Sequence, residues 1–192
     1  MPRRQRIDIP GYYHIANRGV NRVNVFLENV DKDKFLEFLE VSRDIYHFTI
    51  HSFCIMDNHY HLLIETSRTN LSLAIRYVNS RYAAWYNKKE DRIGPLWQGR
   101  FKSWYVYSED YFWLLLRYIE LNPVRAGLEK GVGDFVYSAS HYVVHGLPLS
   151  VLTGSSLYHK DIQAWMGLLD VNELEKLDEY QAQPLAKGNA GI

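Results

Sequence analysis

Residues 49–65 have the sequence TIHSFCIMDNHYHLLIE, and this stretch decides the fold class. It is rich in apolar and β-branched residues, which favour extended structure. The dipeptide Asp57-Asn58 interrupts the apolar run, and both residue types are common in tight turns because their side chains bond to the nearby backbone. We therefore predict two paired antiparallel strands that meet at residues 57–58.

A strand and a helix are predicted before this hairpin. Residues 12–16 favour a strand that ends in a turn at residues 17–19, and residues 23–27 favour a further short extended piece. Apolar residues then recur at helical spacing over residues 31–46, with Asp31 and Asp33 near the positive end of the helix dipole.

A helix, a strand and a second helix are predicted after the hairpin. The helical stripe over residues 71–87 follows Asn70, a good N-cap residue, and residues 101–107 form an aromatic strand. Ser108 caps the next helix, which is expected to end near Asn122 because Pro123 disfavours helical geometry in the residue before it.

The predicted order is β-α-β-β-α-β followed by a helix, which is typical of an α+β, ferredoxin-like fold. Such a fold has a four-stranded antiparallel sheet with helices on one face. The patterns weaken beyond Gly127. We expect a main domain over residues 1–134, a helical extension over 135–183 with short helices within 161–181, and a disordered tail over 184–192, where apolar residues are too few to fold.

The net charge of zero hides an uneven distribution. Residues 1–134 carry 19 Lys and Arg against 16 Asp and Glu, a net charge of +3, and the remainder carries 3 against 6, a net charge of −3. A mildly basic body is compatible with nucleic-acid binding, but +3 is too little for a protein that coats duplex DNA.

Other features of the composition exclude several classes of protein. Cys54 is the only cysteine, so neither a disulfide framework nor a cysteine-rich zinc site is possible, and a buried thiol is expected. No apolar run approaches the roughly 20 residues that cross a bilayer, and the N-terminal residues lack the apolar stretch of a secretory signal. A soluble, cytoplasmic protein without a membrane partner is the expectation.

His59 and His61 lie two residues apart on a predicted strand. Side chains at this spacing point to the same face, which is the geometry of two metal ligands. Histidine pairs at this spacing also occur by chance on half-exposed strands. Because the chain has 8 histidines, the pair alone is a weak indication of a metal site.

Tyr118 and Asn122 lie one turn apart on the helix after the last predicted strand, on its sheet-facing stripe. Packed across the sheet, that helix can bring Tyr118 over His59 and His61. A tyrosine hydroxyl, with a pKa of about 10, is a poor nucleophile unless a divalent cation polarises the phosphate that it attacks. In a chain with 15 tyrosines, Tyr118 can equally be a core residue, and Asn122 a helix C-cap.

Four segments together resemble the REP-associated tyrosine transposases, a branch of the HUH single-tyrosine, IS200-like transposases. They are YHIANRG at 13–19, MDNHYHLLIE at 56–65, WQGRF at 97–101 and RYIELNPVRAGL at 117–128. They follow the family's order and cover about residues 11 to 130. Four ordered motifs are far more specific than the histidine pair or the tyrosine.

The resemblance implies a DNA strand transferase that cuts and rejoins single-stranded or hairpin DNA through a 5′-phosphotyrosine. It implies Tyr118 as the nucleophile, His59 and His61 as ligands of Mg²⁺ or Mn²⁺, and Asn122 as a residue that completes the metal shell. Tyr60 occupies the middle of the His-x-His motif, where an aliphatic residue is also frequent. We expect its side chain to point to the opposite face.

Several other residues are candidates for DNA contact. Basic residues at the ends of elements or in loops can reach phosphates, and a basic arm at the N-terminus can lie along the DNA backbone. Two aromatic rings can contact bases. Each of these side chains can equally be a surface charge or a packing residue. They are Arg18, Arg22, Arg100, Lys102 and Arg125 for phosphates, Arg3, Arg4 and Arg6 for the arm, and His14 and Trp97 for bases.

Two alternatives to the DNA strand transferase remain open. A non-catalytic DNA- or RNA-binding module on the same fold would keep the basic residues without needing Tyr118. A hydrolase that uses metal-bound water would need more ligands than His59 and His61. A covalent protein–DNA adduct separates the transferase from both. A nucleoid location and a monomer or homodimer are the further expectations.

Overall fold

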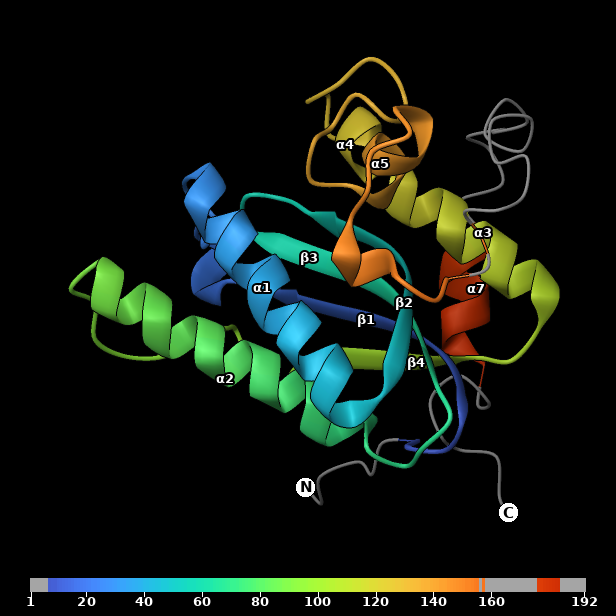
Figure 1. Cartoon of the computed structure of the whole chain (residues 1–192), viewed down its shortest axis with the longest axis horizontal. Helices are drawn as coiled ribbons and strands as arrows, with labels where there is room; N and C mark the ends of the chain where they lie inside the picture. Colours follow the sequence, from blue (N-terminus) through green and yellow to red (C-terminus); the bar gives the residue numbers. More distant parts are fainter. Residues whose placement is uncertain (1–6, 156, 158–175, 184–192) are drawn as a thin grey trace.

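A computed structural model describes residues 7–155, 157 and 176–183 (Figure 1). Its centre is one four-stranded antiparallel sheet with the strand order β2-β3-β1-β4. The strands are β1 (Gly11–Arg18), β2 (Phe48–Ile55), β3 (His59–Thr66) and β4 (Lys102–Val106). With α1 (Asn29–Tyr46) after β1 and α2 (Leu71–Lys89) after β3, the predicted ferredoxin-like fold is confirmed.

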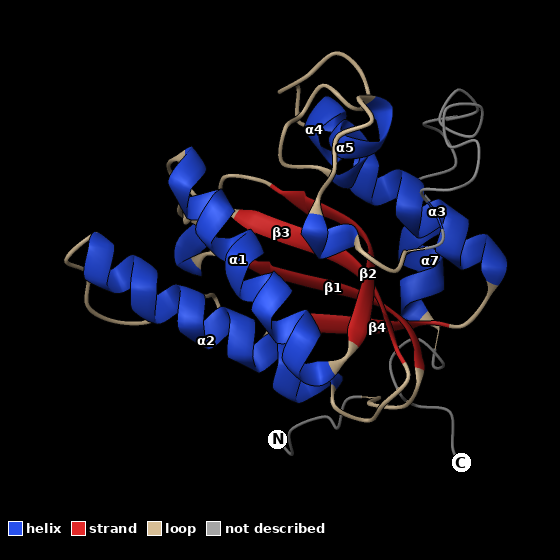
Figure 2. Ribbon diagram, viewed as in Figure 1, coloured by secondary structure: helices blue, strands red, loops and turns tan. Residues whose placement is uncertain are grey.

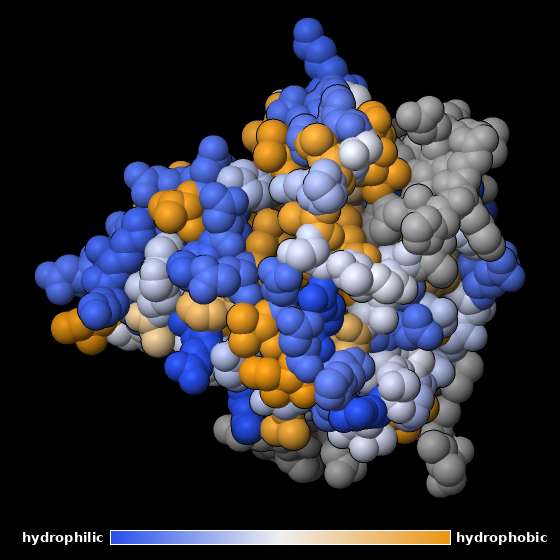
Figure 3. Space-filling model, viewed as in Figure 1, coloured by the Kyte–Doolittle hydropathy of each residue, from blue (hydrophilic) through white to orange (hydrophobic). Residues whose placement is uncertain are grey.

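The two faces of the sheet carry separate cores (Figure 2). Alternate residues of a strand point to opposite faces, so Tyr60, Leu62 and Ile64 pack under α1 and α2, where Tyr60 is fully buried. Leu63 belongs to the other core, beneath α3 (Glu109–Glu120). We call this second side the α3 face. The helix predicted after the last strand therefore lies across the sheet from α1 and α2, whose outer surfaces are largely hydrophilic (Figure 3).

Three local expectations differ from the structure. Residues 23–27 form no strand, because the backbone N–H groups of Val25 and Phe26 both donate to the carbonyl of Asp57 instead of to a sheet edge. Asn70 precedes α2, but its side chain donates to Tyr46, and the carboxylate of Asp8 accepts the first N–H groups of the helix. Helix α3 ends at Glu120, and the short α4 (Asn122–Arg125) follows.

The described part of the segment after residue 134 packs against the same sheet. It contains α5 (Ala139–Val144), the turn η2 (Ser150–Leu152) and α7 (Leu177–Ala182), and α7 lies beside α3 (Figure 1). The expected helices within 161–181 fall largely outside the described residues, as does the tail over 184–192. In the described residues, none of the helices is long and apolar enough to cross a membrane. Cys54 is buried in β2, as expected.

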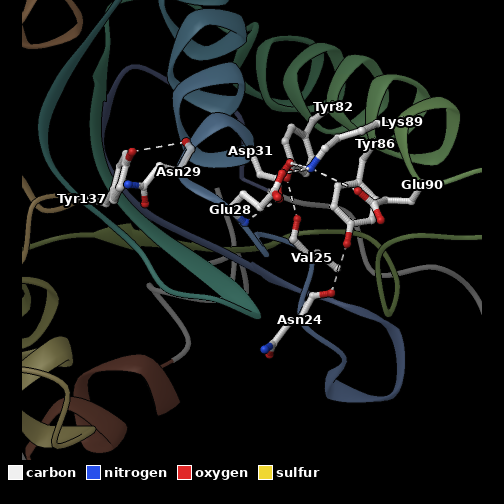
Figure 4. A network of polar contacts seen from close by, with 10 residues as sticks. All are labelled: Asn24, Val25, Glu28, Asn29, Asp31, Tyr82, Tyr86, Lys89, Glu90 and Tyr137. Atoms are coloured by element: carbon white, nitrogen blue, oxygen red, sulfur yellow. Dashed lines mark hydrogen bonds and ion pairs between the residues drawn. The ribbon is translucent and has the colours of Figure 1, made fainter.

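An ion pair with a buried carboxylate joins α1 to α2 (Figure 4). The Lys89 ammonium lies 2.7 Å from the carboxylate of Asp31, which is fully buried, and 2.8 Å from that of Glu28. Asp31 also accepts a hydrogen bond from the backbone N–H of Glu28 at 2.9 Å. The pair fixes the two helices that cover one face of the sheet.

We expect Lys89→Ala to lower the free energy of unfolding by about 3 kcal/mol, because it leaves the buried Asp31 carboxylate without its cation. Urea unfolding checks this value. The matched control is the exposed neighbour Lys88, whose replacement by Ala should change stability by no more than about 0.5 kcal/mol. Equal losses in the two variants would contradict the role given to Asp31.

Glu120 anchors the C-terminal end of α3 to the sheet. Its carboxylate accepts a hydrogen bond of 2.6 Å from the hydroxyl of Ser52 in β2 and one of 3.0 Å from the backbone N–H of Ser140 in α5. Burial raises the pKa of Glu120, although both hydrogen bonds act in the opposite direction. This anchor holds the helix that carries Tyr118.

We expect Glu120→Gln to flatten the pH dependence of stability. Because the folded protein raises the pKa of Glu120 above the ordinary value of 4.5, it binds the proton more tightly than the unfolded chain does. The wild type therefore loses stability as the pH rises from 4.5 through the raised pKa, and the variant lacks that loss. Urea unfolding of both proteins between pH 4 and 8 measures the difference, and parallel profiles would rule out this contribution.

Candidate active site

His59 and His61 of β3 both point to the α3 face, with ring centroids 5.1 Å apart and an angle of 86° between the rings. One nitrogen of each ring is already engaged. The Nδ1 of His59 lies 2.6 Å from the side-chain oxygen of Asn58, and the Nδ1 of His61 lies 2.9 Å from the Nε2 of His14. The hairpin thus presents two imidazoles side by side, each held by a neighbour.

Helix α3 brings Tyr118 to these rings. Its ring centroid lies 5.3 Å from that of His61, at an angle of 87°, and the guanidinium of Arg125 lies 5.4 Å from the Tyr118 ring. Asn122 donates from its side chain to the Tyr118 carbonyl at 2.8 Å, and its amide acts to raise the pKa of His59 against the effect of burial. Asn122 therefore links the tyrosine helix to the histidine strand.

Burial sets the protonation of the site. It lowers the pKa of His59, and that of His61 falls well below the ordinary value. For His14, burial and the nearby Lys102 charge lower the pKa to about 3. The three imidazoles are therefore neutral at pH 7, the form that binds metal ions. Burial also raises the pKa of Tyr118, while Arg125 and a hydrogen bond with Asn122 act to lower it, so its hydroxyl is protonated at pH 7.

The three imidazoles, Tyr118 and Arg125 line a cavity of about 1160 Å³ whose wall is rich in positive charge, and Asn122 is not part of its lining. Asp178 of α7 is the acidic residue of the lining. The five basic residues predicted to contact phosphates all lie on this wall, although they come from four separate segments of the chain: Arg18, Arg22, Arg100, Lys102 and Arg125. The cavity thus combines Tyr118, the histidine pair and a cationic surface.

The two rings predicted to contact bases are packed against neighbouring side chains. His14 is at the base of the cavity with 1% of its surface exposed, stacked on Trp104 at a centroid distance of 4.9 Å. Trp97 does not line the cavity: its indole N–H donates to Asn79 at 3.0 Å, and its ring packs 5.7 Å from that of Tyr60. In this arrangement both rings are packing residues. Arg3, Arg4 and Arg6 lie outside the described residues.

Three cavity residues were not predicted from the sequence. Trp104 stacks on His14, Gln98 accepts two hydrogen bonds from the Arg18 guanidinium, and the Gln181 amide lies 3.0 Å from the Nδ1 of His14. Trp104 lies two residues after Lys102 on β4, and side chains at this spacing point to the same face of the sheet. The predicted strand could therefore have indicated Trp104. No local pattern identifies Gln181.

Comparisons with known proteins identify the family of this chain. The family described as "Transposase IS200 like" matches residues 10–122, which is more than half of the chain. This chain belongs to the IS200-like transposase family. The matched region includes β1, the hairpin with both histidines, and α3 with Tyr118, and it ends at Asn122. The family resemblance seen in the motifs is therefore confirmed.

Two individual relatives add detail to the family assignment. A Haemophilus influenzae protein described as a REP-associated tyrosine transposase is 28% identical over 107 residues, which are 50% of this chain and 61% of the relative. A solved structure of a REP-associated tyrosine transposase bound to a REP hairpin superimposes with a TM-score of 0.62 at 19% identity, covering 81% of this chain and 92% of that one. Because the identity is low, the superposition shows only that this chain shares the fold of that protein.

Proposed function

We propose that this IS200-like transposase cleaves and rejoins single-stranded DNA next to a hairpin, with Tyr118 as the nucleophile. The observation that carries the proposal is the position of Tyr118. Its ring lies 5.3 Å from that of His61, inside a cavity lined by five Lys and Arg side chains. A tyrosine that merely filled the core would not need to share a basic cavity with two neutral imidazoles.

The reaction transfers one phosphodiester bond. The hydroxyl oxygen of Tyr118 attacks the phosphorus, the bond to the 3′ oxygen breaks, and the 3′ oxygen leaves as a hydroxyl after it gains a proton. The phenolic proton passes to solvent. The 5′-phosphotyrosine keeps the energy of the broken bond, so a free 3′-hydroxyl can reverse the step and join strands without a nucleotide cofactor.

The residues present suit a divalent cation, Mg²⁺ or Mn²⁺. His59 and His61 are neutral and side by side, and Asn122 influences the pKa of His59. The described residues contain no group of three or more His, Cys, Asp and Glu side chains arranged for a metal. His59, His61 and Asn122 would hold the cation. The cation would polarise that phosphate and offset its developing charge.

The basic wall of the cavity suits the DNA backbone. The solved structure of a REP-associated tyrosine transposase bound to a REP hairpin supports a hairpin as the substrate, since that protein shares the fold of this chain. With a net charge of +3 over residues 1–134, non-specific attraction is weak, so recognition of a hairpin with a single-stranded flank has to come from fitted contacts.

We expect Lys102→Ala to weaken hairpin binding and to reduce the steepness of its salt dependence by about one unit, because one phosphate contact is lost. Fluorescence anisotropy at several salt concentrations measures both changes. Arg76→Ala is the control, since Arg76 is exposed on α2 and does not line the cavity. An unchanged salt slope in Lys102→Ala would remove this residue from the DNA interface.

A covalent adduct tests the proposal as a whole. Hairpin oligonucleotides labelled at either end are incubated with the protein and Mg²⁺ or Mn²⁺, and the products are boiled in detergent before electrophoresis. We expect the label on the 3′ side of the cut to remain attached to protein, as a 5′-phosphotyrosine requires. Tight hairpin binding without an adduct would instead favour the non-catalytic binding module.

A further inference from the structure

We propose that His14 and Gln181 are positioning residues that set which ring nitrogen of His61 carries the proton. They would leave the Nε2 of His61 unprotonated and able to bind a cation. The inference rests on the proposed function for its purpose, since it assigns a role to two residues behind the metal site. Neither residue touches the phosphate in this role.

The three side chains form one row from α7 to β3. The Gln181 amide nitrogen lies 3.0 Å from the Nδ1 of His14, and the Nε2 of His14 lies 2.9 Å from the Nδ1 of His61. His14 is 1% exposed and His61 7% exposed, and Trp104 stacks on the outer side of His14 at an angle of 21°. The two imidazoles are largely shielded from solvent, so each ring is oriented by its neighbour.

Two arrangements of protons satisfy this row. A neutral imidazole carries one N–H, so one ring must donate and the other must accept where two ring nitrogens meet. If the Nδ1–H of His61 donates to His14, the Nε2 of His61 keeps a free lone pair for a cation. If the Nε2–H of His14 donates instead, the proton of His61 sits on its Nε2 and blocks metal binding.

The orientation of the Gln181 amide selects between the two arrangements. In the arrangement that permits metal binding, the Nδ1 of His14 carries a proton and needs an acceptor, which is the amide oxygen. In the other arrangement, the Nδ1 of His14 is an acceptor and needs the amide NH₂, which is the group that faces it in the structure. A half-turn of the amide exchanges oxygen for nitrogen at the same position. Cation binding at His61 and an oxygen facing His14 are therefore coupled, and each favours the other.

Substitutions of Gln181 separate the two arrangements at pH 8, above the range in which an imidazole ordinarily protonates. Gln181→Glu presents only acceptors and should place the proton of His61 on its Nδ1. Gln181→Leu presents neither group and should leave a mixture. Nitrogen-15 NMR of the metal-free protein distinguishes the two tautomers of His61 directly. The same tautomer populations in wild type, Gln181→Glu and Gln181→Leu would overturn the proposal.

Affinity for Mn²⁺ provides the second readout. We expect Gln181→Glu to bind Mn²⁺ several-fold more tightly than Gln183→Glu, a matched control that adds the same charge at an exposed position two residues away. Equal affinities would show that charge alone acts. His14→Leu should lose about 10- to 100-fold in affinity, as is typical when the partner of a metal-bound histidine is removed. His14→Gln, whose amide oxygen can accept from the Nδ1 of His61, should recover part of that loss.

The two readouts also keep this inference distinct from the proposed function. The tautomer measurement needs neither a cation nor DNA, so it tests the positioning role even if no adduct forms. Conversely, if the wild type forms the adduct but His14→Leu retains both the tautomer and the Mn²⁺ affinity of the wild type, the function stands and the role of His14 and Gln181 is wrong.

Discussion

Tyr118→Phe is expected to abolish the covalent protein–DNA adduct and to leave hairpin binding within about threefold of the wild type. The change removes one oxygen and keeps the ring, so the packing of Tyr118 against His61 and under Arg125 survives. The cost in stability is about one hydrogen bond, or ~1 kcal/mol. Without the oxygen, no phosphotyrosine can form, and the loss of cleavage should therefore be complete.

Neighbouring tyrosines make a control essential. Tyr107 immediately precedes the N-cap of α3, and its ring lies 5.5 Å from that of Tyr111. We expect Tyr107→Phe to form the adduct at the wild-type level, and mass spectrometry of the wild-type adduct to identify the Tyr118 peptide. An adduct on Tyr105, Tyr107 or Tyr111, or an adduct formed by Tyr118→Phe, would show that the nucleophile is wrongly assigned.

The sheet could be predicted because its signals are local. An apolar, β-branched run and the turn at Asp57-Asn58 define the hairpin. Ser108 caps α3 as predicted, by accepting from the N–H of Tyr111 at 3.2 Å. The features that differ depend on contacts distant in sequence. Asp8 caps α2 from 63 positions away, and no pattern around Asn70 could indicate it.

The site residues that lie within sequence motifs were predicted. The site residues that only the fold brings together were missed. His59, His61, Tyr118 and Asn122 lie within two short motifs, and the structure brings the two motifs together. His14 was assigned to DNA because alternation along a strand does not reveal whether the strand is central. The order β2-β3-β1-β4 makes β1 an inner strand, so its side chains are buried on both faces.

Gln181 shows the limit of local reasoning most clearly. It lies in α7, a short helix within the predicted helical extension, and it reaches His14 across 167 positions of sequence. Its role in the cavity depends on the packing of α7 against α3, which only a three-dimensional structure supplies.

Replacing either histidine of the pair is expected to reduce adduct formation by at least about 100-fold, since the loss of a direct ligand should cost more than the 10- to 100-fold typical of an outer partner. His59→Ala is the cleaner variant, because His59 is partly exposed and His61 is 7% exposed within the core. Hairpin affinity should stay within about threefold of the wild type, because the contacts that hold DNA in place are made mostly to phosphates by other residues. Excess chelator should reproduce the loss in the wild type.

The matched control for the pair is His145→Ala, which removes an imidazole at the exposed end of α5, away from the cavity. It should leave adduct formation unchanged. Mn²⁺ binding to the DNA-free protein separates a metal role from a structural one: His59→Ala should lose it, while circular dichroism and the midpoint of thermal unfolding remain close to the wild type. Full adduct formation by the wild type in excess chelator would show that the reaction needs no cation. The neutral imidazoles beside Tyr118 would then have to act as hydrogen-bonding groups for the phosphate instead of as metal ligands.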